Sequence, residues 1–290
     1  MPSEARPWLR WITQPWPRPH TIRRMSGDEV IVFAASAVLA VVVWGVWYIG
    51  PRRIRRLGRP AAGQSLLDLA PLVSLAVLVV VLKTVSAHDV RDDMRYVLLY
   101  FFLGAMWVSV VVRILPFVGL SARDDVVERG NGSAARAIAG AILAITLCFA
   151  GGNIGNGPGW WVVVFSAGLA TVALLLSWLV LEAVARVADV VTIDRDDAAG
   201  IRLAGWLIAC GLIAGVAAAG DWESAEDTVR TFVRVAWPLL PFVAVAALLE
   251  RQWRPTPERP SPSVTAYGAI PALLYIGVAA LYVFQSWPDA

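Results

Sequence analysis

Cysteine and histidine are nearly absent from this sequence, with two of each in 290 residues. Cys148 and Cys210 lie inside long apolar runs, and His20 and His88 fall in different polar segments. The sequence therefore supports neither a disulfide framework nor a Cys/His zinc site. A histidine proton relay would have little to build on. We interpret both cysteines as small buried apolar residues and expect no cofactor or metal.

Charged residues are also scarce. Asp, Glu, Lys and Arg make up 16% of the chain, whereas 58% of its residues are apolar and the mean hydropathy is +0.64. These values indicate a membrane protein. The net charge of +3 does not predict nucleic-acid binding, because the basic residues occur in short clusters between apolar runs and not on one face.

Long apolar runs dominate what is present. About 20 apolar residues in a helix cross the hydrocarbon core. Eight stretches qualify: 30–49, 66–86, 95–117, 135–152, 160–182, 199–219, 230–249 and 266–286. We predict an all-α integral membrane protein with eight transmembrane helices, arranged as four repeated helical hairpins with parallel pseudo-repeats. The membrane domain spans 30–290, with hairpins at about 30–88, 89–154, 155–221 and 222–290. Pro238 and Pro241 should bend the seventh helix.

The distribution of arginine predicts the orientation. Basic residues gather in the loops after the odd-numbered helices, beginning with RRIRRLGR at 52–59, and positively charged loops are retained in the cytoplasm. We therefore expect a multi-pass protein with odd-numbered loops in the cytoplasm and both termini outside. The N-terminal segment 1–29 contains PWLRWITQPWPRP, which has no helical periodicity, so we interpret it as an interfacial arm. Its arginines oppose this orientation.

The middles of the predicted helices contain no ionisable side chain. Charges at mid-membrane are costly and normally mark transported ions or protons. Proton-coupled transport is therefore disfavoured. No Ser/His/Asp, Cys/His or paired-carboxylate arrangement falls where a pocket is implied, so we expect that the protein is not an enzyme.

One polar segment occurs twice. DVVERGNGSAA begins at Asp125, and DVVTIDRDDAA begins 64 residues later at Asp189. The same shift pairs Leu143 with Leu207 and Gly151 with Gly215 inside the apolar runs that follow. Small residues allow close helix contact in lipid. We interpret the match as an internal repeat whose copies are parallel.

The segment from about Met94 to Trp222 also resembles a known family. ERGNGSAARAIAGA, GGNIGNGPGWW and DRDDAAGIRLAG are similar to the domain of unknown function 350, the YjfL-like family of bacterial inner-membrane proteins. Its members carry a polar turn, often with Asn, before paired alanines at a helix start. Here Gly132 and Asp196 stand where Asn is usual. The family has no established reaction; the resemblance implies a bacterial inner-membrane location and a soluble cytoplasmic partner of ATP-grasp type.

The candidate interaction residues fall into three groups. Charged side chains near helix ends could form a cytoplasmic ring for an anionic headgroup or a partner, or could simply anchor the helix ends; they are Arg136, Arg202, Glu182 and Glu250. Asp194 and Asp196 form a D-x-D, which can bind a divalent cation or cap the next helix. Asn153 and Asn156 lie in GGNIGNGPGWW, which is either a tight turn or a re-entrant element presenting carbonyl groups.

These observations favour a non-enzymatic scaffold or accessory subunit in a bacterial inner membrane. It would dock a cytoplasmic partner or anionic lipid through its basic loops. The alternative is a channel or transporter for a small solute or ion, formed by the repeats or by a homo-oligomer. A third hypothesis is an intramembrane enzyme that uses Asp194 and Asp196.

Overall fold

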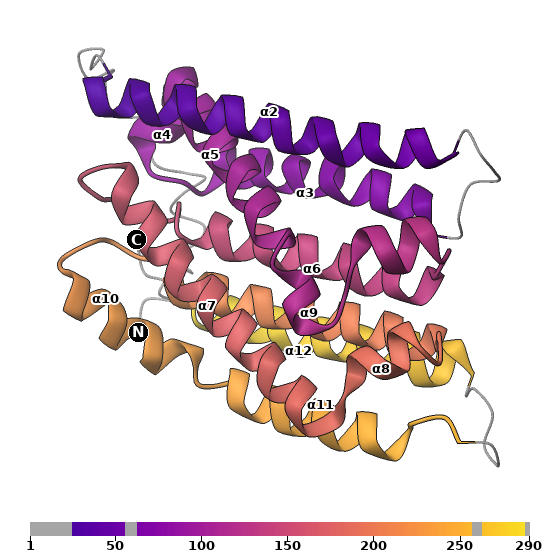
Figure 1. The fold of residues 1–290 in the computed structure, drawn as a ribbon. Helices are drawn as coiled ribbons and strands as arrows, with labels where there is room; N and C mark the ends of the chain where they lie inside the picture. Colours follow the sequence, from indigo (N-terminus) through magenta and orange to yellow (C-terminus); the bar gives the residue numbers. More distant parts are fainter. Residues whose placement is uncertain (1–24, 56–62, 257–262, 288–290) are drawn as a thin grey trace, which may run out of the picture.

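The computed structural model describes residues 25–55, 63–256 and 263–287, without the side chains of 51–55. Within these ranges all the secondary-structure elements are helices, and Figure 1 shows the long helices side by side in one bundle. Among the described residues, eight helices are long and apolar enough to cross a membrane. The predicted class is confirmed to this extent. Most of the predicted interfacial arm lies outside the described residues.

The predicted spans correspond to well-defined helices. They are α2 (Gly27–Arg55), α3 (Gln64–Thr84), α5 (Met94–Val112), α6 (Gly132–Gly151), α7 (Trp160–Ala185), α9 (Asp197–Ala218), α10 (Ala225–Ala236) continued by α11 (Leu239–Gln252), and α12 (Ile270–Gln285). Short helices lie between them: α4 (His88–Asp92), the 3-10 helix η1 (Leu115–Val118), the π-helices η2 (Ala122–Glu128) and η3 (Val264–Ala269), and α8 (Val187–Thr192).

The seventh span is broken where a bend was predicted. α10 ends at Ala236 and α11 begins at Leu239, with Pro238 in the turn between them. Pro238 has no N–H to continue the α10 ladder, and its ring crowds the preceding turn. Pro241 falls in the first turn of α11, where a missing N–H leaves no helical bond unmade.

The centre of the bundle is the contact between α6 and α9, the most extensively packed helix pair. These two spans are also the most buried. A Cβ atom built on Gly151 would lie 2.1 Å from the backbone oxygen of Gly215, and one on Gly211 would lie 2.7 Å from the Cα atom of Ala144. The helix backbones therefore touch, which requires glycine at positions 151 and 211 and small residues opposite them.

The second, fourth, sixth and eighth spans, which are α3, α6, α9 and α12, pack in succession: α3 on α6, α6 on α9 and α9 on α12. Gly205 of α9 lies against Ala272 of α12, so this contact also depends on small residues. Outside this series, α2 packs mainly on α5, and α7 contacts α11. The four most extensive helix contacts are thus between alternate spans of the chain, which run in the same direction (Figure 1), whereas α7 packs on α9 and α6 as well as on α11.

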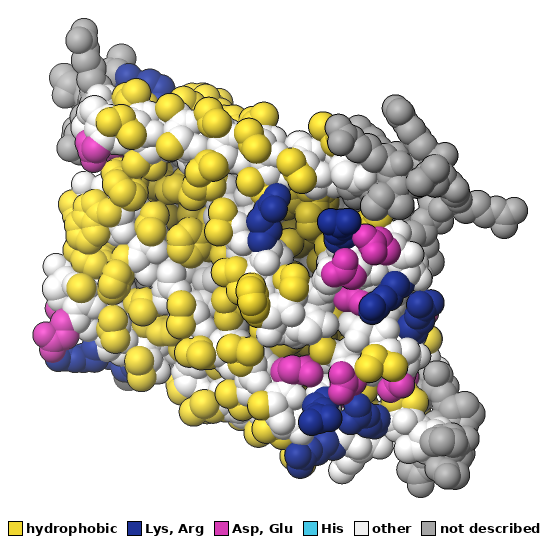
Figure 2. All heavy atoms as spheres, in the orientation of Figure 1, with side chains coloured by type: hydrophobic (Ala, Val, Ile, Leu, Met, Phe, Trp, Pro, Cys, Tyr) yellow, Lys and Arg dark blue, Asp and Glu magenta, His cyan; other side chains and the backbone are white. Residues whose placement is uncertain are grey.

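The connections gather at two ends of the bundle. We call one the glycine-rich end, made of 85–93, 151–159 and 219–224, and the other the basic end, made of 113–131, 186–196 and 253–256. In Figure 2, hydrophobic side chains cover the middle of the face on view, and many charged ones gather at its right-hand end, where α8 lies in Figure 1. An apolar band between polar ends is the surface that a bilayer requires.

Candidate functional site

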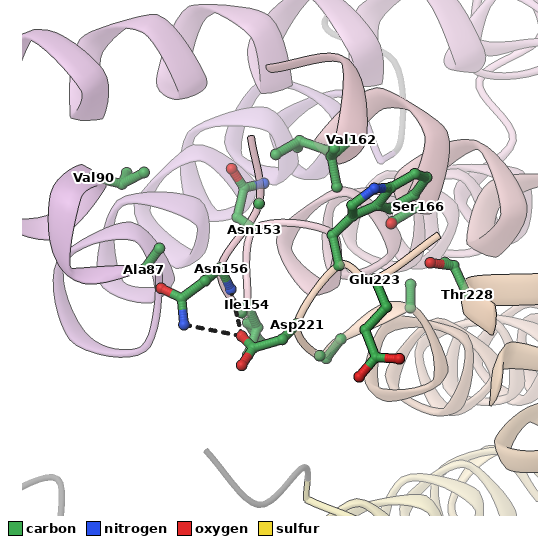
Figure 3. A pocket seen from close by; sticks show the side chains of 18 of the residues that line it. Ala87, Val90, Asn153, Ile154, Asn156, Val162, Ser166, Asp221, Glu223 and Thr228 are labelled. Carbon is green, nitrogen blue, oxygen red and sulfur yellow. Dashed lines mark hydrogen bonds between the residues drawn. The ribbon is translucent and has the colours of Figure 1, made fainter. Parts of the chain in front are cut away.

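A polar cavity of about 250 Å³ lies at the glycine-rich end (Figure 3). Its walls come from the turn at 151–159, the segment 219–223, and the nearby parts of α4, α7 and α10. The predicted residues Asn153 and Asn156 both line it. The turn thus forms one wall of a cavity at the end of the bundle.

Backbone hydrogen bonds join the glycine-rich turn to the segment after α9. The N–H of Gly220 donates to the carbonyl of Ile154, and the N–H of Trp222 donates to that of Asn156, both at 2.8 Å. Gly155 has a φ of +110°, and a Cβ atom there would lie 2.2 Å from the oxygen of Gly220. The close approach therefore requires glycine at this position.

The two predicted asparagines have different environments. Asn156 donates its backbone N–H and its side-chain amide to Oδ1 of Asp221, at 2.6 and 2.9 Å, as the dashed lines in Figure 3 show. Asn153 is only 4% exposed and donates its amide to the carbonyl of Phe149 at 2.8 Å. No residue in the described part of the chain donates a hydrogen bond to its Oδ1. That oxygen is a free acceptor at the cavity wall, and an unmade buried bond is costly.

Four acidic residues line the cavity, and none of the described residues that line it is basic. They are Asp89, Asp221, Glu223 and Asp227. Asp227 also accepts a hydrogen bond from Ser224 at 2.6 Å, and Arg230 approaches it from outside the cavity at 3.6 Å. A recess lined by carboxylates favours cations over anions. Sequence reasoning missed these four residues, because they come from three segments with no shared motif, namely α4, the connection after α9 and the first turn of α10.

The basic end contains a buried ion pair between two of the predicted residues, Arg202 of α9 and Glu250 of α11. They are 2% and 4% exposed and form two parallel bonds of 2.5 Å, Nε to Oε1 and Nη2 to Oε2. Nη1 of Arg202 donates to the backbone oxygen of Tyr267 at 2.5 Å, and the guanidinium lies 5.3 Å from the ring centre of Trp253. The pair therefore joins α9, α11 and η3, and its groups satisfy one another.

The other two residues of the predicted ring have different partners. Arg136 of α6 pairs with Asp197 at 2.5 Å, with both side chains partly exposed. Glu182, near the end of α7, accepts the backbone N–H of Ala188 at 2.8 Å. The structure thus joins Arg202 to Glu250, whereas Arg136 joins the start of α6 to the start of α9 and Glu182 bonds the backbone just beyond its own helix.

The D-x-D residues point into different environments. Asp196 is buried and caps α9 by accepting the backbone N–H of Ala199 at 2.9 Å, whereas Asp194 is exposed. Asn131 caps α6 in the same way, accepting the N–H of Ala134 at 3.1 Å and donating to the carbonyl of Val191 at 2.8 Å. Helix capping therefore accounts for Asp196.

No family model matches the chain, and no curated protein or solved structure matches it.

Proposed function

We propose that the protein is a non-enzymatic scaffold or accessory subunit of a bacterial inner membrane. In this proposal its basic end docks an acidic segment of a soluble cytoplasmic partner. The observation that carries the proposal is a pair of exposed arginines, Arg186 and Arg195, on either side of α8.

Both arginines have a left-handed backbone, with φ of 49° and 54°, and no other non-glycine residue in the described ranges has a positive φ. An L-residue with a side chain pays about 1 kcal/mol or more for this conformation, which glycine adopts freely. Neither guanidinium makes an ion pair with a described residue. Arg186 and Arg195 are thus exposed cations at positions that favour glycine. This supports the proposal that their charges bind a group outside this chain.

The backbone conformation makes a sharp test available. Arg186→Gly and Arg195→Gly remove the charges and relieve the strain together, so the double variant should fold at least as well as the wild type. We expect crosslinking and mass spectrometry of native membranes to recover a specific soluble partner with the wild type and several-fold less with the variant. Arg230→Gln, at the other end of the bundle, is the matched control. No specific partner of the wild type, or equal recovery with the variant, would contradict the proposal.

The packing of α6 against α9 supports a further part of the proposal. We propose that α6 and α9 belong to copies of one repeated hairpin and that odd-numbered loops face the cytoplasm. The 64-residue shift that relates the two polar segments also relates Gly151 to Gly215, which are in contact. Membership of the family that the sequence resembles, with its ATP-grasp partner, remains part of the same proposal.

A second candidate function rests on the acid-lined cavity. A channel or transporter for a small cationic solute would use such a recess at one mouth. Proteoliposomes should then take up a small amine or a metal cation, and Glu223→Gln with Asp227→Asn should lower uptake several-fold. Glu226→Gln, which does not line the cavity, is the control. Impermeable liposomes would exclude this candidate.

A further inference from the structure

A second hollow, of about 530 Å³, which we call the groove, lies between α2, α3, α5 and η2 toward the basic end. Its walls are largely apolar, and the apolar residues that line it include Val43, Trp44, Val46, Trp47, Leu67 and Val112. The Nε1 atom of Trp44 donates to the carbonyl of Ala105 at 2.9 Å, and that of Trp47 to the carbonyl of Leu67 at 3.3 Å. Because both indole donors have backbone partners, the rings present apolar surface to the hollow.

Polar groups lie at the basic end of this groove. Arg113 directly follows α5, is exposed, and makes no ion pair with a described residue. Arg123 contacts Glu128 at 3.0 Å, but its side chain is 78% exposed. Such an exposed pair contributes little to stability, so Arg123 can leave Glu128 for another anionic partner. Both arginines line the groove, so its end favours an anion.

Gln64 adds a second polar requirement. It lines the groove, is 3% exposed, and donates its amide weakly to Asp68 at 3.3 Å. Its Oε1 has no hydrogen-bond partner among the described residues. A buried acceptor without a donor is costly. A ligand that carries a hydroxyl group beside its anionic group would satisfy both Gln64 and the arginines.

The position of the groove identifies the kind of molecule that can reach it. α2 is the least buried span, and Val42 and Val46 are 55% and 57% exposed on its surface. Apolar surface at this depth faces lipid chains, which a soluble partner cannot enter. The combination of an apolar slot and a cationic end is the arrangement of basic lipid pockets between membrane helices.

We propose that this groove binds one anionic phospholipid with a hydroxyl-bearing headgroup, as in phosphatidylglycerol. The phosphate would contact Arg113 and Arg123, the headgroup hydroxyl would donate to Gln64, and an acyl chain would lie along Trp44, Trp47 and Val43. The site deepens the proposed function and rests on it in one respect, since both place an acidic ligand at the basic end.

The test is native mass spectrometry of the purified protein with phosphatidylglycerol or phosphatidylcholine of identical acyl chains. We expect preferential retention of phosphatidylglycerol. Arg113→Gln with Arg123→Gln should reduce that preference by about 25-fold, since each of the two surface cations contributes about fivefold to the binding of anionic lipid. Arg230→Gln, an exposed arginine at the other end, should leave it unchanged. Equal retention of the two lipids by the wild type would overturn the proposal.

A second variant tests the apolar part without changing charge. Gly50 lines the groove, and a Cβ atom there meets nothing within 4 Å. Gly50→Leu should therefore fill the slot and lower retention of both lipids several-fold. Gly45→Leu is the matched control, because Gly45 lies on the same helix with equally open space and does not line the groove. Unchanged retention in Gly50→Leu would place the lipid elsewhere.

The two proposals fail in distinguishable ways. Lipid retention that depends on Arg113 and Gly50, with partner recovery absent or indifferent to Arg186→Gly and Arg195→Gly, would remove the partner proposal and leave the lipid site. Partner recovery that depends on Arg186 and Arg195, with no lipid preference, would remove the lipid site alone.

Discussion

At the scale of single residues, the pair Arg202 and Glu250 shows how this chain places ionisable groups inside apolar helices. Each charge is almost fully buried, so each depends on the other for its hydrogen bonds. Such a pair adds little stability over an apolar pair of the same shape, but loss of one member leaves an uncompensated charge. Its contribution is to fix how α9, α11 and η3 meet.

Glu250→Leu should therefore destabilise the protein by about 3–5 kcal/mol, because Arg202 loses its anionic partner in a buried site. Adding Arg202→Met should recover most of that loss, since the cation is then removed as well. Unfolding of the single and double variants in mild detergent, followed by intrinsic tryptophan fluorescence, would measure both effects. A double variant no more stable than Glu250→Leu would show that the pair matters for packing alone.

At the scale of helices, the contact between α6 and α9 depends on glycines that face backbone. Gly151→Ala would place a Cβ atom 2.1 Å from the oxygen of Gly215 and force the helices apart. We expect a loss of about 1–3 kcal/mol, the usual cost of overpacking. Gly277→Ala in α12 is the control, because its Cβ atom meets nothing within 4 Å. A thermal shift that is equal for the two variants would contradict this account of the contact.

The caps of the same two helices give a second prediction at this scale. Asp196→Ala should cost about 1 kcal/mol through loss of the bond to the N–H of Ala199, and Asp196→Asn should retain most of it. Asn131→Ala should cost more than Asp196→Ala, because Asn131 also donates to the carbonyl of Val191. Thermal unfolding of the three variants would check the order. An Asp196→Asn variant as unstable as Asp196→Ala would assign Asp196 a role beyond capping.

At the scale of the whole molecule, the two ends should be accessible from opposite sides of the membrane. Glu223→Cys lies at the glycine-rich end and Arg123→Cys at the basic end, both in exposed positions. Cys148 and Cys210 are fully buried, so they should contribute little background labelling. In intact cells, a membrane-impermeant maleimide should label Glu223→Cys, and it should label Arg123→Cys only after permeabilisation. The opposite pattern would invert the proposed orientation.

Particular residues show how far sequence reasoning reached. The apolar runs predicted every span to within a few residues at most ends, because a helix that crosses lipid must be both long and apolar. The family resemblance places Gly132, before α6, at the position where Asn is usual. The structure instead caps that helix with Asn131, one residue earlier. A cap depends on the backbone conformation of a single residue, which spacing alone does not specify.

The sequence by itself determined the composition of the chain's surfaces, namely eight apolar helices, polar ends and small residues where helices could touch. Only the tertiary structure decided which helices touch and which side chains meet. Arg202 and Glu250 are 48 residues apart in the chain, and the acidic residues of the cavity come from α4, α10 and the connection between α9 and α10. In lipid, helices associate through shape and a few polar contacts without a hydrophobic drive, so partner choice depends on three-dimensional fit that local hydropathy does not encode.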